Sequence, residues 1–270
     1  MKSLVDPYAD TVPQPPPYPS RYGRTVLATV VLAVVFGYAA QIVELRPLEL
    51  VRDIGNIGVF LKGYLHPSLA HLREYAWQCL VTVCIAMWGT VLALAIAVPL
   101  GLLGARNLSP HPLLYHLARR LMDVFRAVNE FVFALMFVTA VGLGPFAGML
   151  ALGVHTGGVL GKLLSETIEA IDPGQVEGVA AVGASRLHII SFSVVPQVLP
   201  NFLSYMLLRF ESDIRSAAVI GMVGGGGIGF YLWDTIRSFN DREAATVILL
   251  IVAMVMGIDV ISARIRRAVI

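Results

Sequence analysis

The chain has 270 residues, of which 57% are apolar and only 14% are charged. Soluble domains carry about 45–50% apolar and about 25% charged residues. With a mean hydropathy of +0.75, the chain cannot cover itself with polar surface, which excludes a soluble globular protein and indicates a membrane protein. The net charge of +2 excludes nucleic-acid binding driven by bulk charge. We expect Cys79 and Cys84, five residues apart in an apolar run, to be buried thiols, without a disulfide or a metal.

Uncharged apolar runs divide the chain into a tail and a series of predicted spans. Residues 1–24 are polar and Pro-rich, which predicts a disordered cytoplasmic tail before a transmembrane domain at 25–270. A span needs about 20 apolar helical residues. The sequence therefore predicts an all-α fold with about six transmembrane helices, at 25–43, 75–105, 127–143, 146–164, from 191 onward, and at 244–261. The glycine-rich segment 216–233 is interpreted as the end of the fifth helix, a loop and a short helix, with a seventh span as the alternative.

Basic residues predict the orientation of these six spans. Twelve of the 20 Lys and Arg residues fall on the side that holds both termini and six on the other side, with Arg209 and Arg215 left out because they lie in the fifth span. Cytoplasmic loops carry the excess of Lys and Arg. We therefore expect both termini to lie in the cytoplasm.

The segment 165–195 is the one sizeable polar stretch between the fourth and fifth spans. Pro173 and Gly174 separate two short predicted helices, the second at about 175–184. The second helix carries several small residues, which let another chain approach closely. The segment is therefore either an ordinary loop helix or a docking element for a cytoplasmic partner.

This segment resembles the coupling-loop signature of ABC importer permeases. Glu177-Gly-Val-Ala-Ala-Val-Gly183 is followed after nine residues by Ser193-Val-Val-Pro196. Glu177, Gly183 and Pro196 stand at the spacing of the signature. Gly178 and Val179 replace its two alanines, and Ser193 and Val195 replace its isoleucine and leucine.

Other segments between residues 45 and 270 resemble the phosphonate importer permease more closely. They are 119–123, 126–130, 141–148, 162–166, 209–212 and 221–224. The resemblance implies a type I ABC importer permease in the bacterial inner membrane that moves phosphonates by ATP-driven alternating access. Permeases for phosphite and hypophosphite are similar, so these oxyanions remain alternatives.

The same resemblance implies the partners and the coupling residues. The partners are a second copy of the chain, two cytoplasmic ATPases that bind ATP and magnesium, and an extracytoplasmic phosphonate-binding protein. The residues that would contact the ATPases are Glu177, Gly178, Val179, Ala180, Ala181, Gly183 and Ala184.

The chain shows no motif for catalysis or for a cofactor of its own. Gly157–Lys162 lacks the spacing of a phosphate-binding loop, and no metal-ligand or nucleophile motif is present. Gly224, Gly225, Gly226, Gly227 and Gly229 fit a dinucleotide pattern without its strand–helix–strand setting. We interpret them as a tight turn or a gate. An ATPase-independent channel or secondary transporter is the alternative class, but it would need no docking loop.

Charged residues in apolar surroundings are candidates for the translocation pathway, since charge in hydrocarbon is costly. Arg209, Glu211, Asp213 and Arg215 cluster late in the fifth span, and Arg126, Asn129 and Glu130 begin the third. His155 lies alone in the fourth span. The i,i+4 spacing predicts Glu211–Arg215 and Arg126–Glu130 ion pairs, so these groups are either structural pairs or a pathway lining. Gly153, Gly157 and Gly161 form a small-residue face for packing within the subunit or between copies.

Overall fold

The computed structural model describes residues 22–269, which form helices joined by turns without strands. The predicted tail therefore lies outside the described residues up to residue 21. The chain divides into one unit up to Val59 and a second from Phe60 onward. The first unit contains α1 (Tyr22–Ile42), α2 (Pro47–Arg52) and the start of α3 (Ile54–Tyr64). At about 1.5 Å per residue, the 21 residues of α1 are long enough to cross a bilayer.

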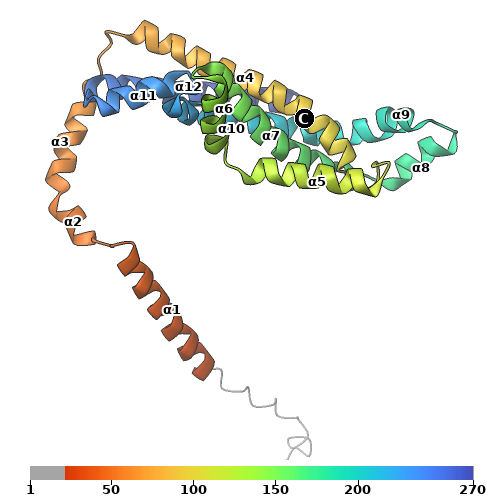
Figure 1. Ribbon diagram of the computed structural model, residues 1–270, viewed down its shortest axis with the longest axis horizontal. Helices are drawn as coiled ribbons and strands as arrows, with labels where there is room; N and C mark the ends of the chain where they lie inside the picture. The colour runs from red at the N-terminus through yellow and green to blue at the C-terminus, as the bar shows by residue number, and fades with distance from the viewer. Residues whose placement is uncertain (1–21, 270) are drawn as a thin grey trace, which may run out of the picture. The chain divides into compact units, whose positions relative to one another are not determined.

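The second unit is a helical bundle (Figure 1). Its elements are α4 (Leu72–Leu103), α5 (Pro112–Ala127), α6 (Glu130–Val141), α7 (Pro145–Glu169), α8 (Pro173–Ala181), α9 (Arg186–Ile189), the π-helix η1 (Ile190–Val194), α10 (Val195–Ile220), the 3-10 turn η2 (Gly221–Val223), α11 (Ile228–Arg237) and α12 (Asp241–Val269). We call the end from which α8 and α9 project the hairpin end. The opposite end, at residues 221–228, is the turn end.

The bundle is organised around close contact between α4 and α7. Small residues make this contact possible, because a Cβ on Gly89 would lie 3.0 Å from Cβ of Leu152, and one on Gly101 3.0 Å from Cβ of Leu164. The residue numbers of the partners increase together, from Gly89 and Leu152 to Gly101 and Leu164, so the two helices run in the same direction. Gly157 packs on Ile96 in the same way, so this part of the predicted small-residue face is used inside the subunit.

The third span differs from the prediction of one helix at 127–143. Since α4 and α7 run in the same direction, the chain between them must return from the hairpin end to the turn end. It does so through α5 and α6, which are bent by 90° at a short break. The 12 residues of α6 measure only about 18 Å and cannot cross the bilayer core of about 30 Å alone. Five helices, or six with the bent pair, are therefore long and apolar enough to span within the described range.

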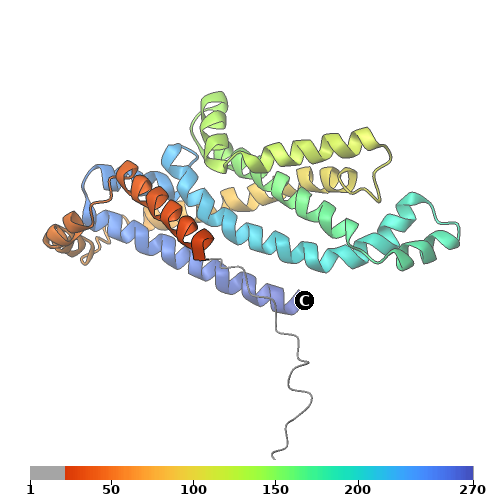
Figure 2. The ribbon, with the colours of Figure 1, turned by 90° about the horizontal axis from the view of Figure 1, so that it is seen from below.

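The fifth and sixth spans pack side by side along the bundle (Figure 2). α10 extends to Ile220, within the segment 216–233 where the sequence predicts the end of the fifth helix, and α9 and the π-helix lead into it. α12 lies antiparallel to α10, because Arg215 pairs with Asp259 and Glu211 with Arg266. The predicted sixth span is confirmed, with additional turns at both ends.

The loop and short helix predicted within 216–233 are confirmed, and the alternative seventh span is wrong. α11 has 10 residues, about 15 Å. The turn before it needs glycine, since Gly224, Gly226 and Gly227 have φ values of +93°, +79° and +77°. This turn is held at both sides: the amide of Gly144 donates to the carbonyl oxygen of Gly224 at 2.8 Å, and the amide of Ile228 donates to Oγ1 of Thr82 at 2.9 Å.

The two thiols have different environments. Cys79 is buried and free, as predicted, but Cys84 is exposed. Five positions along a helix place the two side chains on different faces, and the face of Cys84 borders an apolar groove with Trp77, Trp88 and Phe146. A thiol behaves as a small apolar group, so it is stable in contact with lipid and needs no burial inside the protein.

Gly229 provides a test of the packing at the turn end. A side chain there would collide with the carbonyl oxygen of Ala218, a backbone atom that cannot move aside. Gly229→Ala should therefore lower the free energy of unfolding by about 1–3 kcal/mol, measured by thermal denaturation of the protein in detergent. Gly257→Ala is the matched control, because nothing lies within 4 Å of a Cβ there. Equal stability of the two variants would contradict the packing.

Candidate functional sites

The predicted coupling segment forms a helical hairpin, α8 and α9, that projects from the bundle (Figure 1). α8 begins where Oδ1 of Asp172 accepts a hydrogen bond from the amide of Gly174 at 2.9 Å, with Pro173 at its first position. It ends at Ala181, earlier than predicted, because the chain turns at Gly183 with φ +78°. Ser185 then precedes α9. The glycine of the signature is thus the turn between two short helices.

The surface of the hairpin is unusually apolar for a polar loop. Val182 and Leu187 are 84% and 76% exposed, and Phe192, in the π-helix that follows α9, is 70% exposed. Glu177 is also exposed. A cluster of exposed large apolar side chains beside small residues is typical of a protein-contact surface. The sequence predicted the hairpin but not the exposure of these three residues, because an apolar residue in a loop helix is equally typical of a buried core position.

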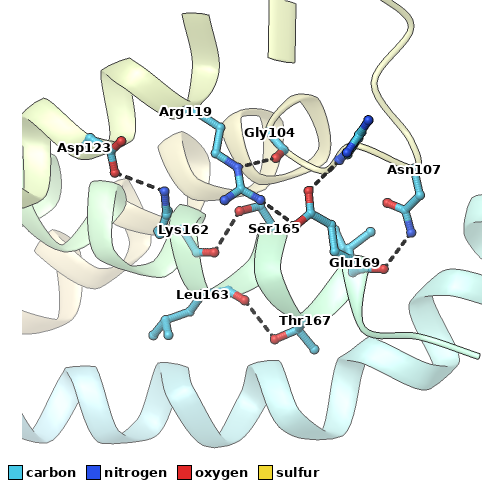
Figure 3. A network of polar contacts seen from close by, with 11 residues as sticks. Gly104, Asn107, Arg119, Asp123, Lys162, Leu163, Ser165, Thr167 and Glu169 are labelled. Carbon is cyan, nitrogen blue, oxygen red and sulfur yellow. Dashed lines mark hydrogen bonds and ion pairs between the residues drawn. The ribbon is translucent and has the colours of Figure 1, made fainter. Parts of the chain in front are cut away.

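The base of the hairpin is held by a polar network between α4, α5 and α7 (Figure 3). Nη2 of Arg119 lies 2.7 Å from Oε2 of Glu169, and Nε of Arg119 donates to the carbonyl oxygen of Gly104 at 2.8 Å. Oε1 of Glu169 accepts from the amide of Arg106 at 2.8 Å. The last turn of α7 is therefore fixed to the end of α4 and to α5, immediately before the chain enters the hairpin.

The network continues along α5. Nζ of Lys162 donates to Oδ1 of Asp123 at 3.1 Å. The guanidinium of Arg126 reaches the same carboxyl oxygen of Asp123, so two cations share one carboxylate. Arg126 therefore pairs with Asp123, at 3.2 Å, and the predicted Arg126–Glu130 pair is wrong. The reason is that the helix breaks between these two residues, so their i,i+4 spacing has no helical geometry.

The start of the hairpin joins α10 through Gln197. Oε1 of Gln197 accepts from the amide of Asp172 at 3.0 Å, and Nε2 donates to the carbonyl oxygen of Ser193 at 3.0 Å. Ser193 lies in the π-helix that connects α9 to α10. Both ends of the hairpin are thus attached to bundle helices, the start to α7 and α10 and the end to α10.

A second group of polar residues lies inside the bundle, where α4, α7 and α10 meet. Oδ1 of Asp213 accepts from Oγ1 of Thr156 at 2.8 Å, and Oδ2 accepts from Oγ1 of Thr90 at 3.3 Å. Nη2 of Arg209 lies 3.5 Å from Oδ1 of Asp213. We call Thr90, Thr156, Arg209 and Asp213 the buried polar cluster.

The remaining candidates from the third and fourth spans border this cluster. Glu130 accepts from Oγ of Ser216 at 2.7 Å and lies 3.4 Å from Nε2 of His155. Nδ1 of His155 is 2.9 Å from the carbonyl oxygen of Val128, so this histidine is not alone. Oδ1 of Asn129 accepts from the amide of Phe131 at 2.9 Å and caps α6, which gives Asn129 a role in helix initiation.

The predicted Glu211–Arg215 pair is wrong. Glu211 pairs with Arg266 at 2.7 Å, and Arg215 pairs with Asp259 at 3.3 Å. These residues face α12, whereas Arg209 and Asp213 face α4 and α7. The four charged residues of α10 therefore form two groups on different faces, and the sequence of one helix could not show which neighbour each face meets.

Comparisons with known proteins agree with this architecture. The family model described as "Binding-protein-dependent transport system inner membrane component" matches residues 97–270. The chain belongs to this family. The matched range includes the hairpin, the glycine turn and three of the four residues of the buried polar cluster, and Thr90 of that cluster lies before it.

Relatives and solved structures support the same assignment. A phosphite transport system permease protein of Stutzerimonas stutzeri is 34% identical and the match covers 87% of each chain. A putative cryptic phosphonate transport system permease protein of Escherichia coli K12 is 53% identical over 44% of this chain and 98% of its own. A chain of the MetNI methionine ABC transporter in an inward-facing conformation superposes with a TM-score of 0.64 at 21% identity, covering 74% of this permease and 96% of that chain. The predicted type I ABC importer permease fold is confirmed.

The network at the base of the hairpin can be tested without a transport assay. Glu169→Ala removes the acceptor for both Arg119 and the amide of Arg106. We expect hydrogen exchange of the amides at 104–108 to become about tenfold faster, since a partly exposed hydrogen bond to a charged group contributes about 1.5 kcal/mol. Glu166→Ala, at an exposed position of α7, is the control. Unchanged exchange in Glu169→Ala would show that the network does not hold the α7 end.

Proposed function

We propose that this permease is the pore subunit of an ABC importer for phosphonates and works by ATP-driven alternating access. The exposed hairpin carries the proposal. It combines the family's signature glutamate and glycine at Glu177 and Gly183 with an exposed apolar surface and with attachments to α7 and α10. The relatives whose names refer to phosphonate and phosphite transport support the class of substrate.

The proposed partners follow from this role. Two cytoplasmic ATPases bind ATP and magnesium and dock on the hairpin through Glu177, Gly178, Val179, Ala180, Ala181, Gly183 and Ala184. A second copy of the chain completes the pore, and an extracytoplasmic binding protein delivers the ligand. Both termini and the hairpin lie in the cytoplasm. The ATPases drive transport because their closed and open states contact the hairpin differently.

We propose that the pathway is lined by Arg209 together with the other polar residues that the sequence marks as candidates, namely Arg126, Asn129, Glu130, His155, Glu211 and Arg215. Arg209 is the strongest candidate, because its side chain is 24% exposed at the edge of the buried polar cluster. A guanidinium group binds phosphoryl oxygens through two parallel hydrogen bonds. The glycine turn at Gly224–Gly229 would act as a gate, since it packs against both α4 and the start of α7.

A phosphite importer is the second candidate function. The relative from Stutzerimonas stutzeri, with 34% identity over 87% of each chain, is a phosphite permease by name. Phosphite shares the phosphoryl oxygens of a phosphonate and lacks its carbon side group, so a pathway built on one guanidinium would accept both. The binding protein would then determine which oxyanion reaches the pore.

Charge reversal in the hairpin tests the docking role. Glu177→Lys should abolish uptake while the protein remains inserted and folded, because the side chain is exposed and supports no packing. The measurement is uptake together with co-purification of the ATPase. Lys replacing Glu166, exposed on α7 outside the hairpin, is the control for a change of charge. Normal uptake by Glu177→Lys would refute the docking assignment.

The substrate class is tested by uptake in cells that lack their own phosphonate importer. The chain is supplied with the ATPase and the binding protein encoded beside it, labelled 2-aminoethylphosphonate and labelled phosphite are offered in separate assays, and unlabelled methylphosphonate is the competitor. We expect uptake that requires all three proteins and that methylphosphonate suppresses. Uptake of phosphite alone would move the substrate to the second candidate. Absence of all uptake by an assembled complex would contradict both.

A further inference from the structure

Among the described residues, Asp213 has a charged side chain that is fully buried, with 1% of it exposed. It lies on the membrane-spanning helix α10, and it receives hydrogen bonds from α4 through Thr90 and from α7 through Thr156. An isolated carboxylate in hydrocarbon is costly, so a buried one with partners from three helices indicates a functional role. The docking and pathway roles described above do not use it.

The contact between Asp213 and Arg209 is loose. The two groups are 3.5 Å apart, and Nη2 of Arg209 is 3.4 Å from Oγ1 of Thr156, whose hydroxyl donates to the carboxylate. Nε of Arg209 is buried without a hydrogen-bond partner. An arginine with an unused donor beside a carboxylate retains capacity for a second oxyanion. Thr156 bridges the two charges and keeps them near each other.

The surroundings limit how tightly an oxyanion can bind at Arg209. Glu130 contacts Ser216, which lies seven residues after Arg209 on the same face of α10. Glu130 and Asp213 both interact electrostatically with Arg209, so two carboxylates act on one guanidinium. Without Asp213, a single guanidinium in a site of low dielectric constant would attract a phosphonate dianion strongly. A translocation site must bind weakly enough for the ligand to leave.

We propose that Asp213 is a positioning residue that holds Arg209 at the pathway and competes with the passing oxyanion for its guanidinium, so that release is fast. This rests on the proposed function, because it assumes that phosphorus oxyanions pass Arg209. In the ligand-free state the carboxylate balances the charge of Arg209. When an oxyanion arrives, Arg209 turns its free donors to it, and the return to Asp213 expels the ligand.

The test uses the complete transporter, reconstituted in lipid vesicles with its ATPase and binding protein. Asp213→Asn keeps the shape and an acceptor for Thr156 but removes the negative charge. We expect the maximal rate of methylphosphonate uptake to fall about tenfold per assembled complex, with KM unchanged, because the binding protein sets capture. Methylphosphonate loaded inside the vesicles should inhibit at about tenfold lower concentration. Asp234→Asn, at an exposed position of α11, is the control.

Three further variants decide between positioning and a purely structural role. Arg209→Gln should slow uptake, and the double variant Arg209→Gln, Asp213→Asn should be no slower than Arg209→Gln alone, because Asp213 acts through Arg209. Thr156→Val, which keeps both charges and the side-chain volume, should slow uptake in the same direction but less, and it replaces Asp213→Asn if that variant does not assemble.

Each outcome has a definite meaning. Uptake and internal inhibition equal to the unaltered complex in Asp213→Asn, or in Thr156→Val if the first variant does not assemble, would overturn the inference and leave the proposed function standing. So would additive losses in the double variant, or full uptake by Arg209→Gln. An unaltered complex that imports no phosphorus oxyanion would refute the proposed function and this inference with it.

Discussion

The contact between α4 and α7 determines the rest of the architecture. Lipid tails are as apolar as leucine side chains, so apolar burial alone does not hold membrane helices together, and close packing of small residues must do so. Gly89, Gly101 and Gly157 allow this approach. Because the two helices run in the same direction, the chain between them has to return across the bundle, which produces the bent α5–α6 pair. The same contact leaves the end of α7 beside the end of α4, where the polar network fixes the base of the hairpin.

The distribution of polar groups follows from the cost of placing them in lipid. At the hairpin end, Arg119 and Glu169 join three helices. In the interior, Asp213 is enclosed by hydroxyl groups and one guanidinium. The hairpin differs from both, because its apolar side chains Val182 and Leu187 are exposed. The first two arrangements stabilise the bundle, and the third leaves a surface that a protein partner can cover.

The sequence predicted the elements whose signal is local. Uncharged runs identified α1, α4, α7 and α12, and the glycines before α11 correctly indicated a turn. The sequence did not predict α5, because charged residues such as Arg119 and Asp123 are typical of a loop between spans. Its apolar residues at Leu113, Leu117 and Leu121 recur every four positions and could have revealed an amphipathic helix. The hairpin could be located from its signature, since that signal is also local.

The partners of charged residues could not be predicted, because each depends on which helix lies opposite. The spacing of Glu211 and Arg215 permitted a pair along α10, but α12 offers Arg266 and Asp259. The enclosure of Asp213 likewise depends on Thr90 and Thr156, which are distant in sequence. Periodicity shows which residues share a face, and only the packed structure shows what that face meets.

The most direct test of the account is site-specific photo-crosslinking of the assembled transporter. A photoreactive amino acid is placed at Val182 on the hairpin or at Leu143 at the turn end, since these side chains are 84% and 79% exposed. The account predicts a crosslink to the ATPase from position 182, with a yield that changes on addition of ATP, and none from position 143. A crosslink to the ATPase from position 143, or its absence at 182 in an active complex, would contradict the claim that the hairpin couples ATP hydrolysis to transport.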